Sequence, residues 1–148
     1  MLVAHGAHLL ATCFMTGVIW FVQIVHYPLL NAVPNNAFSF YHSQHVQRTG
    51  WVVIGPMLLE IVLAFVLFST STMANAQWLS LTGLILLLGI WASTFLSQVP
   101  AHNQLARGFS SDAWRKLVLG NWIRTVGWTL RLPIVAWMTY QAFRNTHY

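Results

Sequence analysis

Residues 51–71 read WVVIGPMLLEIVLAFVLFSTS, an apolar run that contains one charged side chain, Glu60. About 20 apolar residues in a helix span the roughly 30 Å hydrocarbon core of a membrane. The run lacks the alternation of polar and apolar residues typical of a membrane barrel strand, and a helix pairs its backbone groups within the segment. Residues 51–71 therefore predict a transmembrane helix.

Three further runs of the same kind cover residues 2–25, 78–98 and 121–143. Across the chain 57% of the residues are hydrophobic and 6% are charged, whereas about 25% are charged in a soluble domain. A chain of 148 residues has room for one domain. The sequence predicts an all-α fold over residues 1–148, an integral membrane four-helix bundle made of these three helices and residues 51–71.

The two connections over residues 26–50 and 99–120 are long enough to carry structure of their own. We expect a short interfacial helix in each, one over residues 38–48 and one after a cap at Ser110. Most basic residues flank these loops, namely Arg48, Arg107, Arg115, Lys116 and Arg124. Because basic loops remain in the cytoplasm, we expect an inner or plasma membrane protein with cytoplasmic long loops and both termini outside.

Polar side chains follow one side of three predicted helices, at about 100° per residue. They are His5, His8, Thr12, Thr16, Gln23 and His26 on the first helix, His42, His45, Thr49 and Glu60 on the second, and Asn121, Arg124, Trp128 and Arg131 on the fourth. A polar group that faces lipid costs a few kcal/mol. The stripes should therefore turn inward and give the bundle a polar interior.

Glu60 lies nine residues after Trp51, and Arg131 lies ten residues after Asn121. Because both helices start from the same side, the two charges should meet near the middle of the membrane. One interpretation is an ion pair that holds the helices in register, and the other is a role in binding or proton transfer. Glu60, Arg131 and Arg124 are therefore the candidate catalytic residues.

Four histidines fall at the level of the long loops: His26, His42, His45 and His102. Imidazoles are common ligands of transition metals, and His42 and His45 are spaced to share one helix face. We predict that the four bind a metal ion or a haem, with His8, Asn103 and Asn121 as further cofactor contacts. The alternative is that these histidines are hydrogen-bonded interior residues.

The segment VPAHNQL at residues 99–105, followed by NWIR at 121–124, resembles the anthrone-oxygenase-like family of small four-helix membrane proteins. The resemblance rests on Pro100, Asn103, Leu105, Asn121 and Arg124, and it implies a membrane-embedded oxygenase or a relative of one. In the first half, a histidine-bearing helix that ends in WF and then HYPL, residues 26–29, also resembles the bacterial four-helix haem-binding protoporphyrinogen oxidases.

We expect a metal- or haem-dependent oxidoreductase, or an oxygenase-like protein, that acts on a hydrophobic small molecule. The alternative is a non-catalytic accessory subunit of a larger membrane complex, so whether the chain is an enzyme stays open. The expected partners are membrane lipid, the small molecule, and other membrane subunits or a second copy. Nucleic acid is excluded because the seven Lys and Arg residues are scattered. A carrier is disfavoured because no repeat or pair of broken helices is visible.

Overall fold

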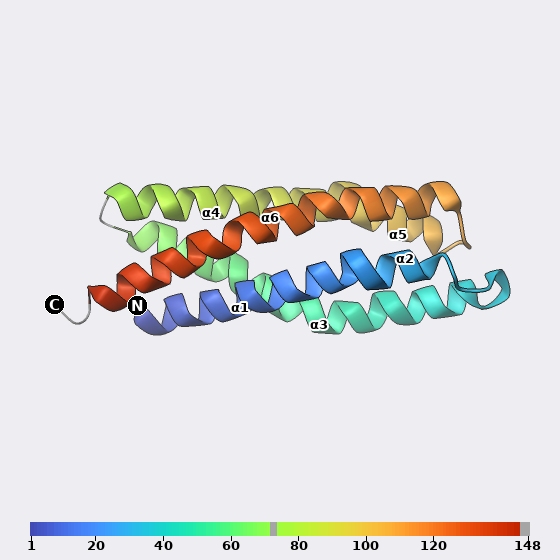
Figure 1. The fold of residues 1–148 in the computed structure, drawn as a ribbon, viewed down its shortest axis with the longest axis horizontal. Coiled ribbons are helices and arrows are strands. Elements are labelled where there is room, and N and C mark those ends of the chain that lie inside the picture. Colours follow the sequence, from blue (N-terminus) through green and yellow to red (C-terminus); the bar gives the residue numbers. More distant parts are fainter. Residues whose placement is uncertain (72–73, 146–148) are drawn as a thin grey trace.

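The computed structural model describes residues 1–71 and 74–145, and within them it contains four continuous helical segments and no strand. The segments are α1 (Leu2–Phe21) with the π-helix η1 (Val22–His26) and α2 (Tyr27–Leu30), α3 (Asn35–Thr70), α4 (Ala74–Ser93) with the π-helix η2 (Thr94–Gln98) and α5 (Val99–Leu105), and α6 (Ser111–Arg144). They lie side by side in one elongated bundle (Figure 1). The predicted all-α, four-helix architecture is confirmed.

The two short connections, residues 31–34 and 106–110, lie at one end of the bundle, which we call the loop end. The start of α1, the end of α3, the start of α4 and the end of α6 lie at the opposite end, the termini end (Figure 1). The two loops therefore lie at the same end of the bundle, and their predicted cytoplasmic location stays a prediction.

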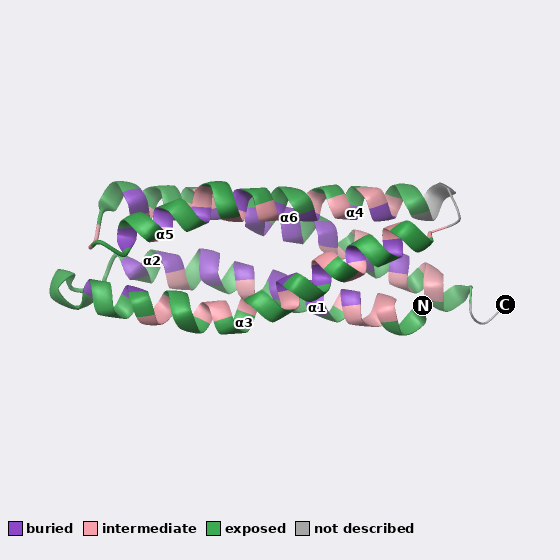
Figure 2. Ribbon diagram, turned by 180° about the vertical axis from the view of Figure 1, so that it is seen from behind, coloured by how far each residue is buried: buried purple, intermediate pink, exposed green. Residues whose placement is uncertain are grey.

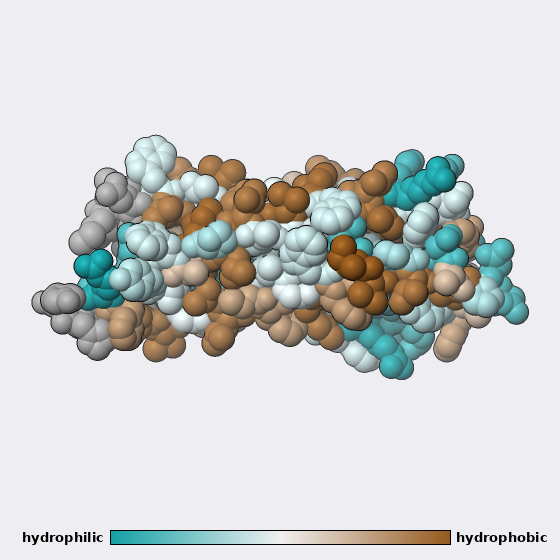
Figure 3. Space-filling model, viewed as in Figure 1, coloured by the Kyte–Doolittle hydropathy of each residue, from teal (hydrophilic) through white to brown (hydrophobic). Residues whose placement is uncertain are grey.

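Three of the four segments, Leu2–Leu30, Asn35–Thr70 and Gln77–Leu105, are long and apolar enough to cross a membrane. The fourth, α6, is less apolar because it carries Asp112 and five basic residues. Hydrophobic side chains, mixed with side chains of intermediate hydropathy, occupy the middle of the face shown in Figure 3, and the most hydrophilic ones lie mainly towards the ends. The buried residues turn towards the centre of the bundle (Figure 2).

The short interfacial helices predicted in the two long connections are not separate elements. Residues 38–48 belong to α3 and the residues after Ser110 belong to α6, and both helices continue without a break. The α6 cap is the predicted one, since the Ser110 hydroxyl accepts a hydrogen bond from the Ala113 amide at 3.4 Å. No proline follows either helix start until Pro56 and Pro133, so nothing ends these helices before the apolar runs begin.

The order of elements repeats in the two halves of the chain, although no repeat is visible in the sequence pattern. Each half has a long helix, a five-residue π-helix, a short helix with proline at its second residue, and a long helix with an interior proline. The prolines are Pro28 and Pro56 in one half and Pro100 and Pro133 in the other. Proline clashes with the carbonyl four residues before it, and a wider π-turn relieves that clash.

Candidate functional site

Four imidazoles from three helical segments lie together in the loop half of the bundle, and we call them the imidazole cluster. They belong to His26 of η1, His42 and His45 of α3, and His102 of α5. The ring centroids of His26 and His45 are 4.2 Å apart, and His102 lies 5.3 Å from His42 and 5.6 Å from His45. The prediction that these four residues share one level is confirmed.

The cluster supplies the donors of a metal site but not the arrangement of one. Nε2 of His42 and Nδ1 of His102 face each other in a hydrogen bond of 3.1 Å, and the His26 and His45 rings are stacked. Zinc-type ligation needs nitrogen lone pairs that converge on one point at about 2.0–2.1 Å. Among the described residues, no group of three or more His, Cys, Asp or Glu side chains is placed to hold a metal ion. Ligation of a metal or haem therefore stays a prediction.

Tyr27 extends the cluster, and the sequence pattern did not single it out. Its hydroxyl lies 3.1 Å from Nε2 of His102, so both nitrogens of that imidazole are hydrogen-bonded. The Trp114 indole donates to the Tyr27 carbonyl at 2.8 Å and holds this turn against α6. A neutral imidazole carries one N–H and one lone pair. The two hydrogen bonds that connect His42, His102 and Tyr27 can therefore pass a proton from one end of the series to the other.

A second polar group of α6 lies deeper in the same half. Arg124 and Asn121 are buried, Arg124 donates to the Asn121 side chain at 3.1 Å, and Asn121 donates to Gln23 at 2.9 Å. Two of the predicted site residues are thus part of one buried network with helix α1–η1. Asn103 differs, because it is exposed on α5 and is not brought to the cluster.

Several buried polar atoms in this half have no hydrogen-bond partner among the described residues. They are Nε2 of His26, Nδ1 of His42, both amide atoms of Gln98, and Nε of Arg124. Gln98 is 2% exposed and packs against Gly120, where an added Cβ would lie 2.9 Å from its amide nitrogen. An unpaired buried polar group costs about 1–3 kcal/mol. These unpaired groups come from η1, α3, η2 and α6, so all four helical segments contribute one.

Glu60 and Arg131 form a fully buried ion pair, as the sequence predicted. The carboxylate also accepts hydrogen bonds from the Thr12 hydroxyl at 2.7 Å and the Trp128 indole at 2.9 Å. The guanidinium donates to the Gly83 carbonyl at 3.0 Å and to Nε2 of His8 at 2.6 Å. These partners offset the desolvation of both charges. His8, a predicted cofactor contact, is thus a member of this network.

The ion pair and the loop half are in physical contact through one aromatic ring. The guanidinium of Arg124 lies 5.5 Å from the centroid of the Trp128 ring, whose indole N–H bonds to Glu60. An indole N–H can donate but cannot accept, so Trp128 does not relay protons. The contact can couple the positions of the two networks but does not join them into one proton path.

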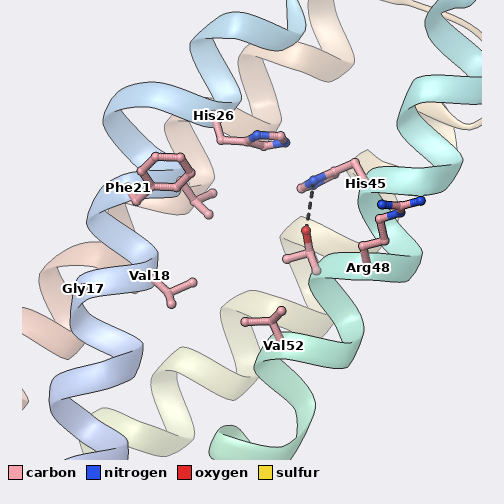
Figure 4. Close-up of a pocket in the computed structure, with 9 residues that line it drawn as sticks. Gly17, Val18, Phe21, His26, His45, Arg48 and Val52 are labelled. Carbon is pink, nitrogen blue, oxygen red and sulfur yellow. Dashed lines mark hydrogen bonds between the residues drawn. The ribbon is translucent and has the colours of Figure 1, made fainter.

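A groove of about 410 Å³ lies beside the cluster, between α1–η1 and α3. Its lining residues are Gly17, Val18, Phe21, Val22, His26, His45, Arg48, Thr49 and Val52. His26 and His45 point towards each other at one end, and Val18 and Val52 line the other (Figure 4). The volume lies within the roughly 300–1,000 Å³ of small-molecule sites. The sequence pattern found the two histidines of this groove but not the groove itself.

Comparison of the chain with protein-family models, with curated proteins and with solved structures gave no match. The function is therefore inferred from the residues of the site and their geometry.

Proposed function

We propose that this protein is an integral membrane oxidoreductase that acts on a hydrophobic small molecule at the imidazole cluster. The observation that carries the proposal is the convergence of four imidazoles and Tyr27 beside a groove that opens on the outer surface of the bundle. The segments that resemble the anthrone-oxygenase-like family, residues 99–105 and 121–124, contribute His102 and Arg124 to the same half. Their position supports redox chemistry at this site.

All four helices cross the membrane in this proposal, including α6. Its two mid-helix arginines, Arg124 and Arg131, are buried inside the bundle and do not meet lipid. Arg115 and Lys116 lie in the first turns of α6 and Arg144 ends it, where charged side chains reach the membrane surface. The lower hydropathy of α6 is thus compatible with a membrane-spanning helix. The basic residues at the loop end support a cytoplasmic location for that end.

The topology can be tested with reporters. A reporter fused after Tyr148 is expected outside the cytoplasm, and one inserted next to Ser110 is expected inside. The physical reason is that Arg107, Arg115 and Lys116 flank the second loop, and basic loops resist translocation. Activity of an alkaline phosphatase fusion and fluorescence of a green fluorescent fusion would report the two sides. The reversed pattern would contradict the orientation.

The chemistry proposed for the cluster is proton exchange with a substrate that is oxidised. Oxidation of a hydroxyl-bearing substrate by two electrons also releases two protons. The imidazole nitrogens and the Tyr27 hydroxyl accept and pass on these protons. Two electrons and two protons go to one acceptor: dioxygen, which becomes hydrogen peroxide, or a lipid-soluble carrier of the quinone class, which becomes its quinol. A transition metal or a haem bound by the same imidazoles would supply one-electron chemistry, and its binding requires the hydrogen bond between His42 and His102 to open.

The experiment that tests this function is the visible absorption spectrum and metal content of protein purified from its native membrane in mild detergent. We expect a band that changes on addition of dithionite, or about one equivalent of a transition metal. The result that would overturn the proposal is a protein that carries neither and shows no oxidation of added hydroquinones. The function would then be that of an accessory subunit of a membrane complex.

A further inference from the structure

The groove between α1–η1 and α3 is polar at one end and apolar at the other. His26, His45 and Arg48 form the end nearer the loops, and Gly17, Val18 and Val52 form the rest of the wall that Figure 4 shows. Gly17 precedes His26 by nine residues, which corresponds to about 13 Å at 1.5 Å per residue. The groove therefore fits a molecule with a polar head and an apolar body, aligned with the helices.

The mouth of the groove opens on the outer surface of the bundle. Phe21 is 58% exposed and Val52 is 49% exposed, and Arg48 is also exposed. A Cβ added at Gly17 would meet no atom within 4 Å, so the wall is open at this position. In the membrane setting of the proposed function, on which this inference rests, the mouth faces lipid. A ligand would therefore enter from the hydrocarbon phase with its head at the level of the loops.

The polar end offers flat surfaces and hydrogen-bond donors. The His26 ring lies parallel to its neighbours, with interplanar angles of 27° to His45 and 17° to Tyr41. Nε2 of His26 is buried without a partner among the described residues, and Nδ1 of His45 is bonded to the Thr49 hydroxyl at 3.0 Å. Arg48 is held at the mouth by its hydrogen bond to Gln44 at 3.2 Å. Such a site favours a planar ring that carries oxygen acceptors.

We propose that this groove binds a lipid-soluble ring compound of the quinone class. The ring lies at the edge of the stacked His26 and His45 pair, its oxygens accept hydrogen bonds from the His45 imidazole and from Arg48, and its tail runs along Gly17 and Val52. A phospholipid fits less well, because its phosphate would find one cationic lining residue, Arg48, and its two acyl chains would need more than about 410 Å³. The groove thus brings a quinone-class molecule to the proton-exchanging imidazoles.

The test is a binding titration of the full chain in phosphatidylcholine nanodiscs with decyl-benzoquinone as the probe. Quinones quench tryptophan fluorescence, and Trp20 and Trp51 adjoin the lining residues Phe21 and Val52 in sequence. We expect saturable quenching in the unmodified protein. Gly17→Leu fills the groove and should weaken binding by at least about tenfold. Val52→Phe fills it from the opposite wall and should act in the same direction.

The matched control is Gly89→Leu on α4. Gly89 is exposed, and a Cβ added there also meets no atom within 4 Å. Gly89→Leu therefore changes helix propensity and apolar surface area as Gly17→Leu does, but at a position outside the groove. Its affinity for the quinone should be unchanged. His26→Ala removes the ring on which the His45 imidazole stacks, and it should weaken binding by roughly tenfold.

Three results would overturn the proposal. They are the absence of saturable quenching, equal affinity in Gly17→Leu, Val52→Phe and the unmodified protein, and displacement of the quinone by lower concentrations of decyl phosphate than of a second quinone. The last result would indicate a lipid-headgroup site. The titration uses no turnover, so it is separate from the proposed function. If the protein binds quinone but has no redox activity, the groove site is supported and the oxidoreductase function is contradicted. If the protein is redox-active but does not bind quinone, the oxidoreductase function is supported and the groove site is contradicted.

Discussion

Replacement of Glu60 by Leu is expected to lower the free energy of unfolding by about 3–5 kcal/mol, because it leaves the Arg131 guanidinium buried without its counter-ion. Arg131→Leu should have a similar effect, since the carboxylate of Glu60 is then the uncompensated charge. Both side chains are fully buried, so neither charge can reach water without opening the bundle. Unfolding in detergent with increasing dodecyl sulfate, followed by circular dichroism, would measure the loss.

The double variant Glu60→Leu with Arg131→Leu tests whether the two side chains stabilise the protein as an ion pair or independently of each other. With both charges removed, the interior keeps two apolar side chains of adequate size, and the loss should be several kcal/mol smaller than the sum of the single losses. It is not expected to be zero, because Thr12, Trp128 and His8 lose their partners. Lys116→Leu, at an exposed position of α6, is the control for removal of a charge and should change stability little. Additive losses would contradict a direct interaction.

The features that could be predicted from the sequence are those that depend on hydropathy and on a regular helical period. Long apolar runs identified the four helices, and the expected depths of Glu60 and Arg131 were enough to predict their contact. The same arithmetic placed His26, His42, His45 and His102 at one level. These predictions succeed because an unpaired charged or imidazole group is costly in apolar surroundings, so the charged and imidazole side chains of these runs pack inside the bundle, where they find partners.

The features that could not be predicted depend on local departures from that period. The π-helices η1 and η2 each place a wider turn before a proline, which changes the face presented by the residues that follow. Tyr27 directly follows η1 and Gln98 is the last residue of η2, and neither was identified as a site residue. Asn103 was expected at the site and is exposed for the same reason, since the phase of α5 is set by η2. The groove exists partly because Gly17 has no side chain to fill it. The sequence alone does not show that Gly17 faces α3, so the groove could not be predicted from it.

The second large effect is expected in the imidazole cluster. His42→Ala, His45→Ala and His102→Ala should each abolish a bound metal or haem, because the ligands come from one compact group and a centre that loses one imidazole loses most of its affinity. His102 should be the most sensitive position, since its ring contacts His42 through one nitrogen and Tyr27 through the other. Metal analysis and visible spectra of the purified variants would measure the loss.

The variants have to remain folded for this result to concern the site. A truncated imidazole leaves a small polar space in the loop half, while the Glu60–Arg131 network that joins α3 to α6 is untouched, so helical content by circular dichroism should be retained. The controls are His5→Ala and His147→Ala, which should retain the bound group. His5 lies on the first turns of α1 at the termini end, and His147 lies outside the described residues.

If all five variants keep the metal or haem equally, the cofactor is bound elsewhere. If only stability changes and the unmodified protein binds nothing, the hydrogen bonds of His42, His102 and Tyr27 are structural, and the histidines serve to hold η1, α3 and α5 together.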